Sequence, residues 1–131
     1  MKVKLIIWIA LVFSLSSCDP AQTLEIENKT SDSSTIKFFF TGEDYYKFDN
    51  FLTKDSLILG LDSGATKIFD FGIGTWEIHN SLDSLITRVD KVEIETKKST
   101  ELFESDTQVK SFFWDRLIDD KYRARIIIDI E

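Results

Sequence analysis

The sequence predicts an all-β fold, an antiparallel β-sandwich of about seven or eight strands with one short helix, after a cleaved signal peptide. From Thr23 onward, short segments of alternating apolar and polar residues are separated by turn-forming Gly, Asn, Asp and Ser. The last segment has a wholly apolar face, and such a face is typical of a strand inside a sheet. The side chains on that face are Tyr122, Ala124, Ile126, Ile128 and Ile130.

The first two predicted strands lie on either side of a polar turn. Leu24 and Ile26 alternate with glutamates, and residues 28–34 (NKTSDSS) then favour a turn. In residues 35–41 (TIKFFFT) three apolar side chains share one face. We therefore expect these two strands to pair as a hairpin. Residues 42–54 mix acidic and aromatic side chains without a period and indicate a loop or an irregular edge segment.

Two more strands are predicted at residues 56–61 (SLILGL) and 67–73 (KIFDFGI), joined by a turn in which Gly64 can adopt a positive φ. Gly72 and Gly74 indicate a bulge or bend at the end of the second strand. The apolar neighbours of Trp76 and Trp114 favour core positions for both indoles.

One short helix is predicted after Asn80-Ser81, a plausible cap. Leu82, Leu85, Ile86 and Val89 follow the i, i+3, i+4, i+7 spacing of a helix crossing an end of the sheets. Alternation then returns at residues 92–95, and residues 101–104 predict the returning strand. Residues 106–120 fit either a strand or an amphipathic helical turn.

The N-terminal region has the layout of an export signal, with a basic start and an uncharged run over residues 5–15. As a helix this run would be about 16 Å long, too short to span a hydrocarbon core of ~30 Å. It ends in Leu15-Ser16-Ser17-Cys18 (LSSC), which resembles the bacterial lipobox. The resemblance implies cleavage before Cys18 and a lipid on its sulfur; the alternatives are an ordinary signal peptide with an incidental Cys and a buried free thiol.

Cleavage would divide the chain into a signal peptide at 1–17, a lipidated tether at 18–23 and one β-sandwich domain at 24–131. Removing Lys2 and Lys4 from 16 basic side chains leaves 14 against 23 acidic ones, a net charge of −9. This balance argues against nucleic acid or an anionic bilayer surface as a partner, because both need a basic footprint.

The composition also excludes several catalytic classes. His79 is the only histidine, which excludes a His-based triad and a multi-His zinc site by count. With Cys18 at the lipobox, no thiol nucleophile remains. No cofactor and no metal site are predicted, since Glu43, Asp44 and Asp49 lack the spacing of a calcium-binding EF-hand.

Two kinds of site remain open. Acid pairs such as Asp44 with Asp49, or Asp115 with Asp119, would suit a carboxylate-only hydrolase, although ordinary solvated charge is the favoured interpretation of both pairs. An aromatic loop would suit a glycan-binding module, or would instead fold back over the core. The aromatic candidates are Tyr45, Tyr46 and Phe48.

Asp55-Ser56-Leu57 and Asp83-Ser84-Leu85 resemble the O-glycosylation sites of exported Bacteroidota proteins, with Ser56 and Ser84 as acceptors. The lipobox, the first strand ending in Asn-Lys-Thr-Ser and the acidic β-rich domain are together similar to small uncharacterised lipoproteins of that phylum. The expected protein is thus lipid-anchored at Cys18 on the periplasmic side of an envelope membrane, the outer rather than the inner. It would act as a non-enzymatic interaction or accessory module with an envelope protein or glycan partner.

Overall fold

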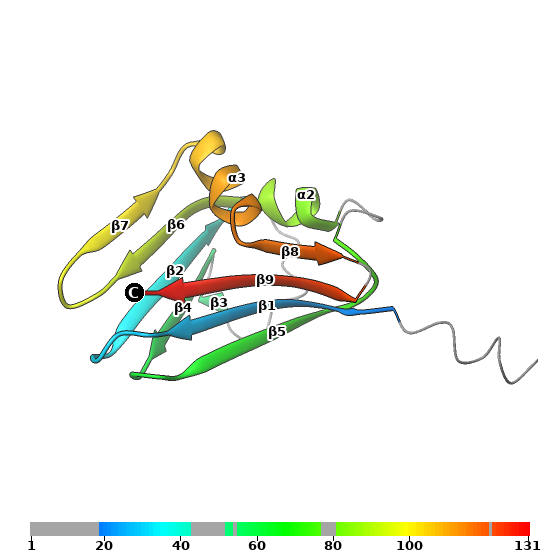
Figure 1. Cartoon of the computed structure of the whole chain (residues 1–131). Coiled ribbons are helices and arrows are strands. Elements are labelled where there is room, and N and C mark those ends of the chain that lie inside the picture. Colours follow the sequence, from blue (N-terminus) through cyan, green and yellow to red (C-terminus); the bar gives the residue numbers. More distant parts are fainter. Residues whose placement is uncertain (1–18, 43–51, 54, 77–80, 121) are drawn as a thin grey trace, which may run out of the picture.

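The computed structural model describes residues 19–42, 52–53, 55–76, 81–120 and 122–131, which form two β-sheets packed face to face (Figure 1). The predicted β-sandwich is therefore confirmed. Sheet A has the strand order β5 (Thr66–Ile73), β1 (Ala21–Asn28), β9 (Arg123–Ile130), β8 (Leu117–Asp120). Sheet B has the order β3 (Leu52–Thr53), β4 (Ser56–Leu61), β2 (Ser34–Phe40), β6 (Val89–Glu95), β7 (Thr100–Phe103).

The core lies between the sheets and is built by the period-two alternation of the strands. In β1 and β9 every second side chain is buried, including Leu24, Ile26, Ile126 and Ile128. As its apolar face predicts, β9 lies inside sheet A, between β1 and β8. It pairs in parallel with β1 and antiparallel with β8.

The predicted hairpin of the first two strands is wrong, because β1 lies in sheet A and β2 in sheet B. The turn between them carries the chain from one sheet to the other. The reason is the buried side chain of Asn28, whose Nδ2 donates to the carbonyl of Leu61 in sheet B at 2.9 Å. The backbone N–H of Asn28 also donates to the Ala65 carbonyl at 3.0 Å, so the β4–β5 turn crosses between the sheets beside it.

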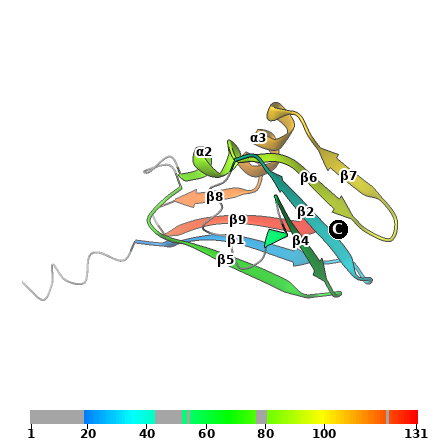
Figure 2. The same cartoon turned by 180° about the vertical axis from the view of Figure 1, so that it is seen from behind.

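The predicted helix is present as α2 (Ser81–Ile86), and a second helix, α3 (Asp106–Trp114), resolves the ambiguity of residues 106–120. A capping box at α3 joins Ser105 and Gln108. Figures 1 and 2 show both helices along the side where β8 and the β6–β7 hairpin diverge. The buried face of α3 fills this side with Val109, Phe112 and Phe113.

Of the two predicted core indoles, only Trp76 is buried, with its side chain fully enclosed. Trp114 is 39% exposed, because successive residues of a helix point about 100° apart and Phe113 takes the core-facing position. The predicted bulge is present, since the β1–β5 register shifts between Gln22, opposite Gly72, and Thr23, opposite Asp70.

The sandwich has two distinct ends. At one, called the tether end here, the N–H of Gly74 donates to the carbonyl of Pro20 at 2.8 Å, and Ala124, near the start of β9, pairs with Gln22, near the start of β1. At the other, the far end, the β1–β2 and β6–β7 turns meet, with Lys97 Nζ 3.1 Å from Asp32 Oδ1. Because β1 begins at Ala21, only Asp19 and Pro20 precede it among the described residues of the predicted tether.

Candidate functional site

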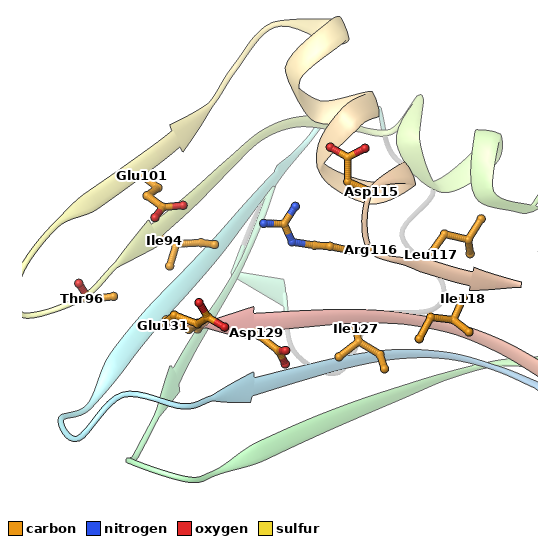
Figure 3. Close-up of a pocket in the computed structure, with 11 residues that line it drawn as sticks. Ile94, Thr96, Glu101, Asp115, Arg116, Leu117, Ile118, Ile127, Asp129 and Glu131 are labelled. Carbon is orange, nitrogen blue, oxygen red and sulfur yellow. The ribbon is translucent and has the colours of Figure 1, made fainter.

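A cleft of about 580 Å³ opens between the edges of the two sheets and extends to the far end (Figure 3). Its apolar lining comes from both sheets and consists of Ile94 of β6, Leu117 and Ile118 of β8, and Ile127 and Ile130 of β9. Its polar lining consists of Thr96, four carboxylates and one guanidinium. The charged side chains are Glu101, Asp115, Asp129, Glu131 and Arg116.

The cleft exists because β8 is shorter than β9. The β8–β9 pairing extends to Leu117 opposite Ile126, and one further bond joins the N–H of Ile127 to the carbonyl of Arg116 at 3.1 Å. Beyond that point the chain on the β8 side turns away into α3, while β9 continues beside β1 to Ile130. Within the described chain, the last residues of β9 have no strand on their β8 side.

Arg116 is held at the inner end of the cleft by the last turn of α3. Its Nη1 donates to the carbonyl of Phe112 at 3.0 Å, and its guanidinium lies 4.2 Å from the centroid of the Phe112 ring. Contact with an aromatic ring and a hydrogen bond together restrict the orientations that a guanidinium can adopt. Arg116 therefore forms a fixed cationic wall at one end of an otherwise acidic cleft.

Asp129 lies on the lining with one carboxylate oxygen paired and one enclosed. Lys29 Nζ donates to its Oδ2 at 2.6 Å, and this hydrogen bond raises the pKa of Lys29. Its Oδ1 is buried and has no hydrogen-bond partner among the described residues. Across the cleft, Glu101 is opposite Ile94 in the β6–β7 register and shares its side of the sheet, so its carboxylate faces the same space.

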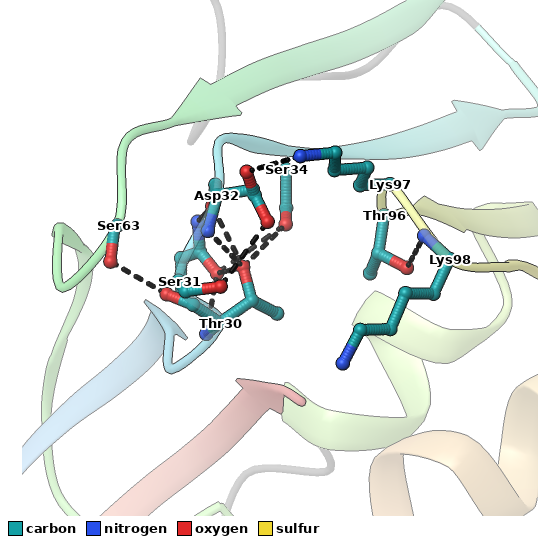
Figure 4. A network of polar contacts seen from close by, with 9 residues as sticks. Thr30, Ser31, Asp32, Ser34, Ser63, Thr96, Lys97 and Lys98 are labelled. Atoms are coloured by element: carbon teal, nitrogen blue, oxygen red, sulfur yellow. Dashed lines mark hydrogen bonds and ion pairs between the residues drawn. The ribbon is translucent and has the colours of Figure 1, made fainter.

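A second hollow of about 430 Å³ adjoins the cleft at the far end and shares Thr96 and Glu131 with it. Three lysines line it: Lys29, Lys97 and Lys98. Figure 4 shows the polar network of the β1–β2 turn beside Lys97 and Lys98. The two hollows together form a groove whose inner part is acid-rich and whose outer part is lysine-rich.

The network of the far end is organised by Asn28, which is fully buried. Its Nδ2 donates to the carbonyls of Asp32 and Leu61, and its Oδ1 accepts from the N–H and the Oγ1 of Thr30. Every hydrogen-bonding atom of this amide therefore has a partner, and Asn28 has a structural role. The sequence offered a signal for this turn, the run of Asn, Thr, Ser and Asp, but none for the burial of its first residue.

Most of the predicted site residues lie outside the part of the chain that the structure describes. Cys18, Tyr45, Tyr46 and Phe48 lie outside the described residues, as do Glu43, Asp44, Asp49 and His79. Of the two predicted acceptors for O-glycosylation, Ser56 is buried in β4 at 8% exposure, whereas Ser84 is exposed on α2.

The predicted acid pair Asp115 and Asp119 does not form one site, because the two carboxylates lie in different surroundings. Asp115 lines the cleft, whereas Oδ1 of Asp119 accepts from the backbone N–H of Trp76 at 3.2 Å. Sequence reasoning missed the acids that line the cleft with Asp115, because Asp129 and Glu131 follow the pattern of the polar face of a strand and Glu101 lies in a strand whose inward side the sequence did not identify. Only the unequal lengths of β8 and β9 bring them together.

Over the ranges that the structure describes, no helix is long and apolar enough to cross a membrane, and no three His, Cys, Asp or Glu side chains are placed to hold a metal ion. No protein-family model, curated protein or solved structure matches the chain. The groove combines a mixed apolar and charged lining with a free strand edge among the described residues. Both are features of a binding surface.

Proposed function

We propose that the protein is a lipid-anchored, non-enzymatic interaction module of the cell envelope, attached through Cys18 and binding a partner in the groove of the far end. The observation that carries this proposal is the position of the groove relative to the tether. The chain enters β1 at Ala21, and β1 reaches the far end at Asn28, eight residues and roughly 25 Å away. A lipid on Cys18 would thus leave the groove directed away from the membrane, on its periplasmic side.

The surface of the tether end supports the same orientation. Ile73 is 73% exposed and Tyr122 is 76% exposed, and both lie next to the first residues of β1. Aliphatic and tyrosine side chains are suited to the boundary between lipid headgroups and acyl chains. Stable attachment needs more than one acyl chain or an additional contact, and these two side chains would supply such a contact.

Lipid attachment is tested first, by labelling the native host with a fatty-acid probe. The wild-type protein should carry the label and the Cys18→Ser variant should not; a labelled variant would refute the anchor. Hydroxyl-radical footprinting of the lipidated protein on vesicles then tests the orientation. Tyr122 should become protected relative to the Cys18→Ser protein, whereas Leu102, exposed on β7, should react equally in both.

The binding role is tested by placing a photo-crosslinking residue at Thr96, which lines both hollows, or at Ile58, which is exposed on β4. We expect a discrete crosslinked product in the native envelope from position 96 and none from position 58. That product should disappear when Glu131 is replaced by Lys. Equal products from both positions would contradict a groove-specific partner.

A second candidate function, a carboxylate-only hydrolase, is favoured by the four carboxylates on one cleft. Glycoside hydrolysis needs two acids of unequal pKa on opposite sides of the scissile bond. This candidate predicts turnover of chromogenic glycosides that is abolished by Glu101→Gln. The interaction module instead predicts no turnover by either the wild-type protein or the Glu101→Gln variant.

A further inference from the structure

We propose, on the basis of the function proposed above, that the groove binds an extended peptide segment of a partner protein. The segment would pair with the free edge of β9 and alternate apolar with Lys or Arg side chains. Within the described chain, that edge consists of the residues beyond Ile127, the last to bond on the β8 side. An unpaired strand edge is a template for another extended chain.

The direction of the backbone N–H and C=O groups on β9 identifies which residues can form hydrogen bonds with an incoming strand. Along a strand, successive residues direct their N–H and C=O to opposite sides. Ile127 donates toward β8 and Ile130 accepts from Lys29 on the β1 side at 2.8 Å, so Asp129 directs both backbone groups toward the cleft. An incoming strand would continue the line of β8 antiparallel to β9 and exchange two hydrogen bonds with Asp129.

The same geometry fixes which side chains of the incoming strand face the core. Cross-strand partners point to the same side of a sheet. A residue opposite Ile128 or Ile130 would enter the space above Ile94 and should be apolar. A residue opposite Asp129 would point to the outer side of the sheet, where Asp129 is already paired with Lys29 and the Glu131 carboxylate is the nearest further acid along the strand, and it should be basic.

Charge favours a basic segment over the other candidates. The segment would lie in the cleft, the inner part of the groove, whose lining carries four carboxylates against one guanidinium, which Phe112 already holds. Asp129 is paired with Lys29, so the excess negative charge comes from the other three carboxylates, Glu101, Asp115 and Glu131. A second copy of this chain is a poor occupant, because the mature chain carries a net charge of −9. A glycan is less suited as well, since none of the described lining residues is aromatic and sugars bind by stacking on aromatic rings.

The test uses fluorescein-labelled peptides and the purified lipidated protein in detergent. The peptide (Val-Lys)4 should bind and (Val-Glu)4 should bind at least about tenfold more weakly. Glu131→Lys should weaken the binding of (Val-Lys)4 by about tenfold. The matched control Glu104→Lys makes the same charge change on an exposed side chain outside the lining, and should change the affinity less than about twofold.

N-methylation separates strand pairing from simple charge attraction. In the proposed register the Lys residues direct their N–H groups to β9 and the Val residues direct theirs away. Methylation of the Lys amides should therefore abolish binding, whereas methylation of the Val amides should leave it within about threefold of the parent peptide.

Three results would overturn the inference: no preference for (Val-Lys)4 over (Val-Glu)4, equal weakening by Glu131→Lys and Glu104→Lys, or equal loss on methylation of either set of amides. If the Thr96 crosslink persists in the native envelope while (Val-Lys)4 fails to bind, the proposed function stands and the peptide chemistry is wrong. If neither is observed, both are wrong. A dimer that forms in sedimentation experiments and dissociates in Glu131→Lys would identify a second copy as the occupant instead.

Discussion

The tether end and the far end of the sandwich are closed by different chemistry. At the tether end the fully buried ring of Trp76 packs 5.1 Å from the ring of Phe71, and its Nε1 donates to the carbonyl of Ala124 at 2.9 Å. At the far end the enclosed residue is Asn28, whose amide makes five hydrogen bonds with the surrounding turn and strands. A large side chain fills the space at the tether end, whereas hydrogen bonds fix the turns at the far end.

This difference accounts for the groove at the far end, although a further hollow of about 540 Å³ lies between α2, α3 and the start of β6. A large ring fills the space between the sheets, and the surface of the tether end is left with the single exposed side chains of Ile73 and Tyr122. A small amide fixes the backbone of the turns without filling the space around them. The far end can therefore hold its loops in place and still leave a groove, with charged side chains free to line it.

The largest expected effect is at the tether end. Trp76→Ala should lower the free energy of unfolding by about 3–5 kcal/mol, because it removes a fully enclosed ring and leaves a cavity. Urea denaturation monitored by circular dichroism measures the loss. Trp114→Ala is the matched control on a partly exposed indole, and should cost no more than about 1 kcal/mol. Equal losses in the two variants would mean that Trp76 does not close this end.

At the far end, Asn28→Ala should cost about 2–3 kcal/mol, because it leaves the buried carbonyl of Leu61 and the turn N–H of Thr30 without their partners. The variant should also weaken crosslinking from Thr96, since the turns that line the groove lose their fixed positions. Ser63→Ala removes an exposed hydrogen bond to the same turn and should stay within about 0.5 kcal/mol of wild type. A destabilised Asn28→Ala protein with an unchanged crosslink would separate the network from the groove.

The sequence correctly predicted where several strands lie and which face of each is buried. Alternation correctly predicted the buried side of β1, β2 and β9, and the apolar face of β9 correctly placed it inside a sheet. These predictions succeed because the period of the side chains is a property of each strand alone. The bulge beside Gly72 follows from the local conformational freedom of glycine in the same way.

Pairing between strands could not be predicted in this way. A hairpin and a crossing between sheets need the same alternation, so β1 and β2 were predicted as neighbours although they lie in different sheets. The groove depends on the early end of β8 and on α3, whose apolar residues fitted a strand equally well. Among the predicted site residues, only Asp115 lines the cleft that the structure describes.

Substitution of one glycine at each end tests the same comparison, with smaller expected losses in the free energy of unfolding. Gly64, in the β4–β5 turn of the far end, has φ of +74°, whereas Gly72, at the bulge of the tether end, has φ of +114°. Neither position has an atom within 4 Å of an added Cβ, so backbone strain alone should decide the outcome. Gly72→Asn should cost about 1–2 kcal/mol and Gly64→Asn distinctly less, since asparagine tolerates φ near +60°. Thermal unfolding measures both, and a reversed order would contradict this account.

The smallest expected effect on stability comes from one ion pair at each end, and the two pairs should lose their contributions at opposite extremes of pH. At the tether end the hydrogen bonds from Arg123, and one from the N–H of Tyr122, lower the pKa of Asp120. Because the folded pKa is the lower one, this pair stabilises the fold above the unfolded pKa of about 3.9 and loses its contribution as the pH falls through the folded pKa. At the far end the hydrogen bond to Asp129 raises the pKa of Lys29, so that contribution is present below about pH 10.4 and is lost as the pH rises through the folded pKa.

Asp120→Asn should therefore lower the urea midpoint at pH 7, and its difference from wild type should shrink at pH 3, where the wild-type carboxylate begins to be protonated. Lys29→Gln should differ from wild type at pH 7, and that difference should shrink only in strong alkali. Both pairs are exposed, so the midpoint shifts should be small and should decrease further in 1 M salt. If the Asp120→Asn difference were unchanged at pH 3, the hydrogen bonds of the turn rather than its charge would hold the β8–β9 hairpin beside the tether.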